Sequence, residues 1–164
     1  MTARSTVFSP CRQYRYTLWR DWTDILSGDR GYAQFIGLNP STADETNDDP
    51  TVRRCIQFAK DFGCSALCMT NLFAWRATDP KMMLAARDPV GPENDHWLKL
   101  IAGEAKVIIA AWGNDGRHLS RSKAVKEMLA PCGLQCLKVN VKTGEPSHPL
   151  YLPASLRPIP FPQL

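Results

Sequence analysis

The sequence predicts an α/β protein, a three-layer α/β/α sandwich around a mostly parallel, four-stranded sheet with an antiparallel strand or hairpin added at the N-terminus. Apolar strand-like segments alternate with segments of helical periodicity along the chain. The central strand segments are almost continuously apolar, which is typical of parallel strands covered on both faces. The 164 residues fit one domain with a sizeable core.

The first elements illustrate these patterns. Residues 14–22 alternate and are rich in aromatic side chains, which predicts a strand. Residues 33–40 form a short apolar segment that ends at a proline, which predicts a second strand. Residues 49–63 begin with Asp-Pro, carry apolar residues at helical spacing and end in glycine, so they predict a helix.

The pattern then repeats. In chain order we expect a strand at 65–73, a long connection at 76–92, a helix at 93–105, a strand at 106–113, a helix at 120–133 and a strand at 134–140. The proline-rich end of the chain is expected to be extended. We therefore divide a single domain, 1–164, into an N-terminal strand addition (1–30), an α/β core (31–152) and an extended tail (153–164).

Composition limits the function. The chain is 44% hydrophobic and 22% charged, as in ordinary globular proteins. It has no long apolar run, and its first residues lack the apolar segment of a signal peptide, so we expect no membrane partner and a cytoplasmic location. The net charge of +4 permits contact with nucleic acid but does not require it. Nothing in the sequence indicates the oligomeric state.

Six cysteines raise the question of a metal. Cys64/Cys68 and Cys132/Cys136 are two C-x3-C pairs that could hold zinc or an iron–sulfur cluster. The spacing is not the usual C-x2-C, and Cys68 lies in an apolar segment. We therefore expect the cysteines to pack in the core and expect no cofactor.

Polar segments follow each of the predicted core strands. They are residues 39–44, 71–76, 112–117 and 142–151. Because ligands bind beyond the carboxyl ends of the strands in open α/β sheets, these segments are expected to share one rim. Each also has a purely structural interpretation: Asn39-Pro40 as a turn, Asn71 as a local cap, Trp75 and Trp112 as core aromatics, and His148 as a hydrogen-bond partner.

The loop between the first core strand and the helix is acidic. Asp44, Asp48 and Asp49 either form a solvated loop or bind a divalent cation, and we prefer the first interpretation. Further along, Arg117, Arg121 and Lys123 surround the expected start of a helix, where backbone N–H groups favour anions. These three residues are candidate phosphate ligands, although a solvated helix end is an equally simple explanation.

The motifs RYTLWR, FIGLNPSTAD, DPTVRRCIQFA, TNLFAWRATDP, AAWG and HPLYLP extend over nearly the whole chain. Through them the chain resembles a bacterial and phage family known as domain of unknown function 1643. More distantly, the order of the motifs is similar to that of the uracil-DNA glycosylase superfamily. That resemblance implies that Asn39 positions the attacking water, that Asn71 reads the edge of the base, and that His148 supports charge on the base carbonyl.

The chain also departs from the superfamily. In the superfamily, an aromatic residue that stacks on the base usually follows the motif that GLNP, residues 37–40, resembles. Here Ser41 and Thr42 occupy those positions instead. Phe73, Trp75 or Trp112 could replace the aromatic residue, with Arg76 beside them. The acidic insert would repel DNA unless Arg53, Arg54 or a metal neutralises it.

Three functions follow from this interpretation. The first is hydrolysis of the N-glycosidic bond of a damaged or modified pyrimidine in DNA, which needs a flipped base and stabilised negative charge. The second is metal-assisted chemistry on a free nucleotide. The third is non-catalytic binding of a flipped or modified base, because the amide of Asn39 cannot accept a proton near neutral pH.

Overall fold

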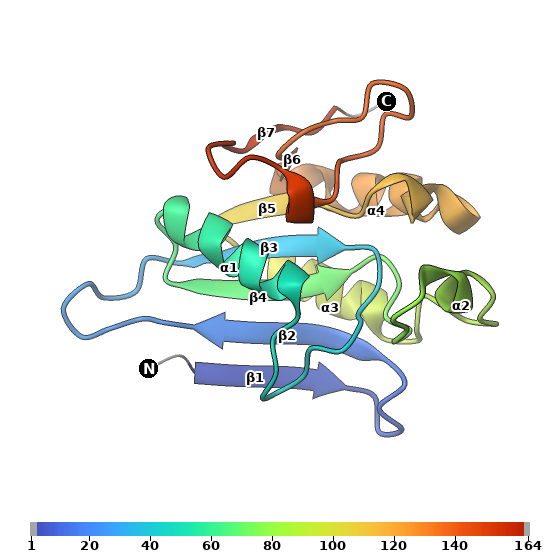
Figure 1. Cartoon of the computed structure of the whole chain (residues 1–164), viewed down its shortest axis with the longest axis horizontal. Coiled ribbons are helices and arrows are strands. Elements are labelled where there is room, and N and C mark those ends of the chain that lie inside the picture. The colour runs from blue at the N-terminus through green and yellow to red at the C-terminus, as the bar shows by residue number, and fades with distance from the viewer. Residues whose placement is uncertain (1–2, 163–164) are drawn as a thin grey trace.

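A single mixed sheet organises the chain (Figure 1). The structure is a computed structural model that describes residues 3–162. The strands are β1 (Ala3–Phe8), β2 (Arg15–Asp21), β3 (Tyr32–Gly37), β4 (Ala66–Asn71), β5 (Val107–Ala110), β6 (Leu134–Cys136) and β7 (Ile159–Pro160). Their order in the sheet is β1-β2-β4-β3-β5-β6-β7. The α/β class is confirmed.

In the part of the chain that the structure describes, the sheet has seven strands, so the expectation of a four-stranded sheet was wrong. The neighbours β4, β3, β5 and β6 run parallel, while β1, β2 and β7 are antiparallel to their neighbours. Both ends of the chain thus join the sheet. β7 escaped prediction because it has only two residues and one is proline, which is tolerated at a sheet edge.

The described residues also form four α-helices: α1 (Pro50–Asp61), α2 (Pro80–Leu84), α3 (Asn94–Ala102) and α4 (Arg121–Leu129). Asp49 begins α1 by accepting a hydrogen bond from the Val52 N–H at 2.8 Å, with Pro50 next to the cap. The same Asp-Pro pattern begins α2, inside a segment that was expected to be a plain connection.

The helices lie on both faces of the sheet (Figure 1). On one face, Phe58 of α1 packs with Phe35 of β3 in one apolar cluster. On the other, Leu98 of α3 and Val125 of α4 share a second cluster with Ile36. Phe35 and Ile36 are adjacent, so the strand alternation directs one side chain to each cluster.

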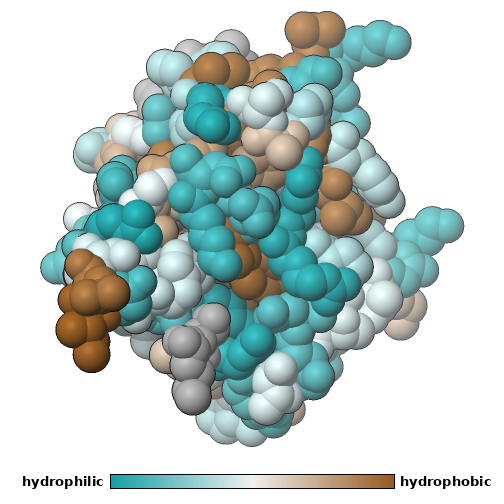
Figure 2. Space-filling model, turned by 60° about the vertical axis from the view of Figure 1, so that its left-hand side comes forward, coloured by the Kyte–Doolittle hydropathy of each residue, from teal (hydrophilic) through white to brown (hydrophobic). Residues whose placement is uncertain are grey.

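One face of the molecule carries both hydrophilic and hydrophobic residues. Figure 2 shows a face on which hydrophilic residues predominate and hydrophobic residues form small separate groups. Among the described residues, no helix combines the length and apolar character needed to span a membrane. Four cysteines pack in the core, Cys55, Cys64, Cys68 and Cys136, but Cys11 and Cys132 are exposed, so the expectation of core packing was wrong for these two.

Candidate functional site

A cavity of about 540 Å³ opens at the carboxyl edge of the parallel strands. Three successive strand ends contribute to it: residues 37–41 after β3, Asn71 at the end of β4 and Trp112 just after β5. Residues 148 and 150–151, which follow β6, also line it, and so does the start of α1. Segments from distant parts of the sequence therefore meet in one hollow.

Asn71 supplies an unpaired amide to this cavity. The residue is 2% exposed, and its Nδ2 is buried without a hydrogen-bond partner in the described part of the chain. Leaving such a donor unpaired costs about 1–3 kcal/mol. Gly37 permits this placement, since a Cβ there would lie 2.8 Å from Asn71 Oδ1. Asn71 thus lines the cavity with an amide whose buried donor is not used by the described residues.

Asn39 is held in a fixed orientation. Its Nδ2 donates to the backbone carbonyls of Ala77 at 2.9 Å and Pro40 at 3.2 Å. These carbonyls accept only, so the nitrogen of the amide must face them. The amide oxygen is consequently the group that Asn39 can present to a water molecule in the cavity.

His148 lies at the cavity wall before a short 3₁₀ turn, Pro149–Tyr151. Its Nδ1 accepts a hydrogen bond from the Leu150 N–H at 3.2 Å. Surrounding protein lowers the pKa of His148 by desolvation, while the charge of Asp49 partly opposes this shift. Desolvation and the hydrogen bond that Nδ1 accepts both favour the neutral ring, which then carries its proton on Nε2 as a donor.

Two charged residues also line the cavity, Arg15 and Asp49. Asp49 was expected in a solvated loop or as a metal ligand, and Arg15 was not predicted as a site residue. Because β2 runs antiparallel to β4, the first residue of β2 lies at the carboxyl edge of the parallel strands. Pairing of the N-terminal strand next to β4 would have placed Arg15 here, but the sequence pattern does not specify that pairing.

The other predicted base-binding residues divide into two groups. Ser41 and Trp112 line the cavity, but Thr42, Phe73, Trp75 and Arg76 do not. Phe73 is fully buried in the core, and Trp75 packs edge-on against Tyr14 at 5.6 Å between ring centroids. The guanidinium of Arg76 lies 4.7 Å from the centre of the Phe8 ring.

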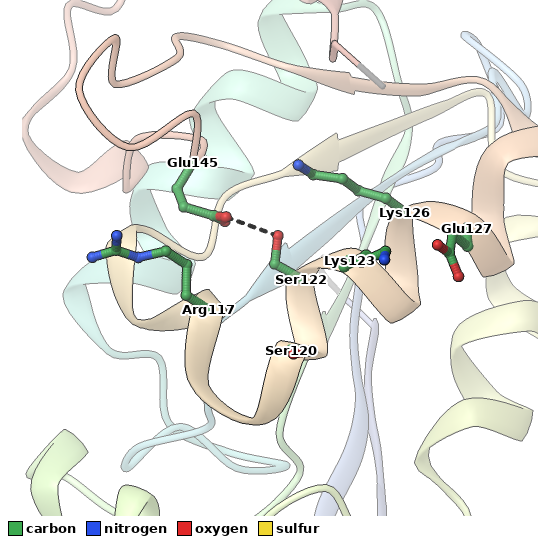
Figure 3. A pocket seen from close by; sticks show the side chains of 7 residues that line it. All are labelled: Arg117, Ser120, Ser122, Lys123, Lys126, Glu127 and Glu145. Atoms are coloured by element: carbon green, nitrogen blue, oxygen red, sulfur yellow. Dashed lines mark hydrogen bonds between the residues drawn. The ribbon is translucent and has the colours of Figure 1, made fainter. Parts of the chain in front are cut away.

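A second hollow of about 310 Å³ lies beside α4 (Figure 3). It brings together Arg117 and Lys123, two predicted phosphate ligands, with Lys126. Figure 3 also shows Glu145 bonded to Ser122, at 3.0 Å. Glu145 accepts a second hydrogen bond from Trp112 Nε1 at 2.6 Å, so this carboxylate holds the indole that lines the main cavity.

The remaining arginines predicted to bind DNA make internal contacts. Arg121 is buried, where its Nε donates to the Leu72 carbonyl at 2.8 Å and its Nη2 pairs with Asp95. Arg53 donates to the Asp48 carbonyl at 2.9 Å. Arg54 donates to the Leu152 carbonyl and lies over the Phe58 ring. None of the three lines either hollow.

The acidic loop does not gather its carboxylates. Backbone N–H groups of Thr46 and Asn47 bind Asp44 and lower its pKa to about 2. Asp48 pairs with Arg20 at 2.7 Å, and Asp49 caps α1. Within residues 3–162 no group of three or more His, Cys, Asp or Glu side chains is placed to hold a metal.

These features define an α/β protein with a polar, partly charged cavity at the carboxyl edge of its parallel strands. A family model described as "Protein of unknown function (DUF1643)" matches residues 15–150. The chain belongs to that family, which confirms the expected family membership. Neither a curated protein nor a solved structure matches the chain.

Proposed function

We propose that the cavity binds a nucleobase and that the protein hydrolyses the N-glycosidic bond of a damaged or modified pyrimidine in DNA. The observation that carries the proposal is the presence of Asn39, Asn71 and His148 around one cavity, although they come from distant segments. The helices on both faces of the sheet also suit the α/β/α sandwich of uracil-DNA glycosylases. Carboxyl-edge cavities are the usual ligand sites of such sheets.

Each side chain fits a step of this reaction. The unpaired amide of Asn71 offers a donor and an acceptor to the edge of a pyrimidine. The oxygen of Asn39 orients a water molecule toward the anomeric carbon. As the bond breaks, the electron pair stays on the base, and Nε2–H of neutral His148 donates to the carbonyl that becomes negative.

An aromatic residue also lines the cavity and is placed to stack on the exposed face of the base. Tyr151 lines the cavity and is 90% exposed, so its ring is free to stack on a base or on its neighbour in the strand. It takes the place of the aromatic that is missing after Asn39. Arg117 and Lys123 would contact phosphates on one side of the DNA.

The test is a panel of single- and double-stranded oligonucleotides that carry uracil, hydroxymethyluracil and other modified pyrimidines. The expected result is formation of abasic sites by the wild type and its loss in Asn39→Ala and His148→Ala. Arg53→Ala, which alters a residue outside the cavity, serves as the control. Failure of the wild type to cleave or bind any of these oligonucleotides would refute the proposal.

A second candidate, non-catalytic binding of a modified base, is favoured by one observation. The amide of Asn39 is anchored to backbone carbonyls and cannot accept a proton from water. Tight binding to one modified oligonucleotide, lost in Asn71→Ala and without bond cleavage, would identify this function.

A further inference from the structure

Arg15 is the charged group in the cavity that the proposed chemistry does not use. It is the first residue of β2 and is 2% exposed. Its Nη1 donates to the Ala43 carbonyl at 3.0 Å, but its Nε is buried without a partner in the described part of the chain. A guanidinium carries five donors, so most of its hydrogen-bonding capacity is unused.

Within residues 3–162, no carboxylate forms an ion pair with this guanidinium. The ion pairs within the described residues are Arg4–Asp48, Arg12–Glu45, Arg20–Asp48 and Arg121–Asp95. Burial lowers the pKa of Arg15 to about 10, so the side chain stays positive at neutral pH. A buried charge without an ionic partner is unfavourable, and it is normally matched by a ligand or counter-ion.

Other charges also act on Arg15. The charge of Asp49 raises the pKa of Arg15 and so favours its positive form, while the charges of Arg76 and Arg20 lower it. The Asp49 carboxylate is committed to the start of α1, where it accepts from the Val52 N–H. Asp49 therefore attracts Arg15 from a distance and would weaken, without blocking, the binding of an anion beside it.

We propose that Arg15 forms an anion-binding subsite inside the cavity, so that the ligand is a nucleobase compound that carries an acidic group. The nucleobase part of this inference rests on the proposed function, and the acidic group is inferred from Arg15. The acid is either the phosphate of a nucleotide or a carboxylate on the ring, since guanidinium groups bind both in the same forked geometry. Asn71, on the adjacent strand β4, would hold the base.

Matched pairs of probes test the subsite directly. Isothermal titration at one pH and one salt concentration compares uridine with uridine 5′-monophosphate, uracil with uracil-6-carboxylate, and inorganic phosphate alone. In each pair the base is kept and only the acid is added. We expect the acidic member of at least one pair to bind tighter by a factor of about ten or more. The pair that responds identifies the source of the acid.

Variants assign the effect to Arg15. Arg15→Gln should abolish the preference for the acidic member. Arg12→Gln is the matched control, because Arg12 lies just before the same strand but is exposed and pairs with Glu45. Asp49→Asn retains a side chain that caps helices and removes the repelling charge. It should tighten phosphate or monophosphate binding by a factor of several. If Arg15→Gln does not fold, Asp49→Asn decides the question alone.

The outcomes separate the two proposals. Equal affinity for neutral and acidic probes, a preference that survives in Arg15→Gln, or an unchanged affinity in Asp49→Asn overturns the subsite and leaves the nucleobase proposal standing. Binding of phosphate that needs Arg15, without any binding of base or nucleoside, supports the subsite and refutes the nucleobase proposal. Absence of binding by every probe overturns both.

Discussion

Gly37 and Asn71 lie side by side at the ends of β3 and β4, and the close approach of the asparagine depends on the missing side chain of the glycine. The two residues are paired in the parallel register of these strands. A Cβ on Gly37 would stand 2.8 Å from Asn71 Oδ1, closer than van der Waals contact permits. Because Gly37 has no side chain, the Asn71 amide can occupy its observed position.

Replacement of Gly37 by alanine should displace this amide. We expect Gly37→Ala to lose binding of the base by at least about tenfold, and to destabilise the fold by about 1–3 kcal/mol through overpacking. Titration with the responsive probe and chemical denaturation measure the two effects. Gly103→Ala is the control, since its new Cβ would meet its nearest neighbours at an ordinary 3.5 Å. Unchanged ligand affinity in Gly37→Ala would show that Asn71 does not contact the base.

Arg20 should contribute far more to stability than other arginines near the loop. Its side chain is fully buried, pairs with Asp48 at 2.7 Å and donates to the carbonyl of Asn47 at 3.2 Å. Arg20→Ala leaves the Asn47 carbonyl without this donor and leaves Asp48 with only its exposed partner Arg4, so we expect a loss of about 2–4 kcal/mol in the free energy of unfolding. Denaturant titration provides the measurement.

The exposed pair Arg12–Glu45 is the natural comparison for that experiment. Both of its side chains are about half exposed, 50% and 47%, so Arg12→Ala should cost at most about 1 kcal/mol. Similar losses in the two variants would mean that burial of Arg20 does not determine its contribution.

His148 should make stability depend on pH. The fold lowers the pKa of His148, mainly by desolvation. Below the ordinary His pKa of about 6.5, His148 is therefore protonated in the unfolded chain but still neutral in the folded chain. The stabilisation is therefore complete above that pH and is lost as the pH falls toward the lowered pKa. Denaturation between about pH 5 and 8 should show a smaller slope in His148→Gln than in the wild type. Parallel slopes would contradict the assigned pKa shift.

Glu145 should be needed to hold Trp112 in the cavity wall. Its carboxylate accepts from Trp112 Nε1 at 2.6 Å and from Ser122 Oγ at 3.0 Å. Glu145→Ala leaves two buried donors unpaired, so we expect a loss of about 2–4 kcal/mol and a change in tryptophan fluorescence. Glu127→Ala, at an exposed site of the same hollow, should change neither. A wild-type emission spectrum in Glu145→Ala would argue against this role.

Asn39→Asp tests the limits of the amide. A carboxylate at this position could accept the proton of the attacking water, but it would face the carbonyls of Ala77 and Pro40 that Nδ2 now binds. We expect faster formation of abasic sites together with a loss of about 1–3 kcal/mol in stability at neutral pH. The loss should shrink at acidic pH, where the protonated carboxyl donates to those carbonyls. Stability equal to that of the wild type at neutral pH would contradict the anchored geometry.

The sequence predicted the parallel centre of the fold because its strands are continuously apolar and its longest helix, α1, has a clear start. Asp49-Pro50 marks the beginning of α1, and the cap is seen in the structure. The edges were harder to predict. β7 has no strand pattern, and Asp79-Pro80 was overlooked as the start of α2 because only five residues follow the cap. Such short elements depend on tertiary contacts rather than on local periodicity.

The candidate site was likewise predicted only in part. Asn39, Asn71 and His148 were singled out by the resemblance to uracil-DNA glycosylases, and they were expected at one edge because each lies at or beyond the end of a predicted strand. Arg15 precedes its strand, so only the antiparallel pairing of β2 with β4 reveals its position. Arg121 was assigned to phosphate because its neighbours are basic, but burial directs it to Asp95 instead. Charge alone in a sequence does not show which side chains point inward.

The arginines that pair with the acidic loop also affect how strongly salt would weaken the binding of a polyanion to this surface. Arg12 pairs with Glu45, and Arg4 and Arg20 share Asp48, so two of these three positive charges are already balanced within the protein and have no counter-ions to exchange with phosphates. Binding of a nucleic acid would then release few small ions, and the logarithm of its affinity should fall only gently with the logarithm of salt concentration. Recognition would rest on what enters the cavity rather than on attraction to the strand.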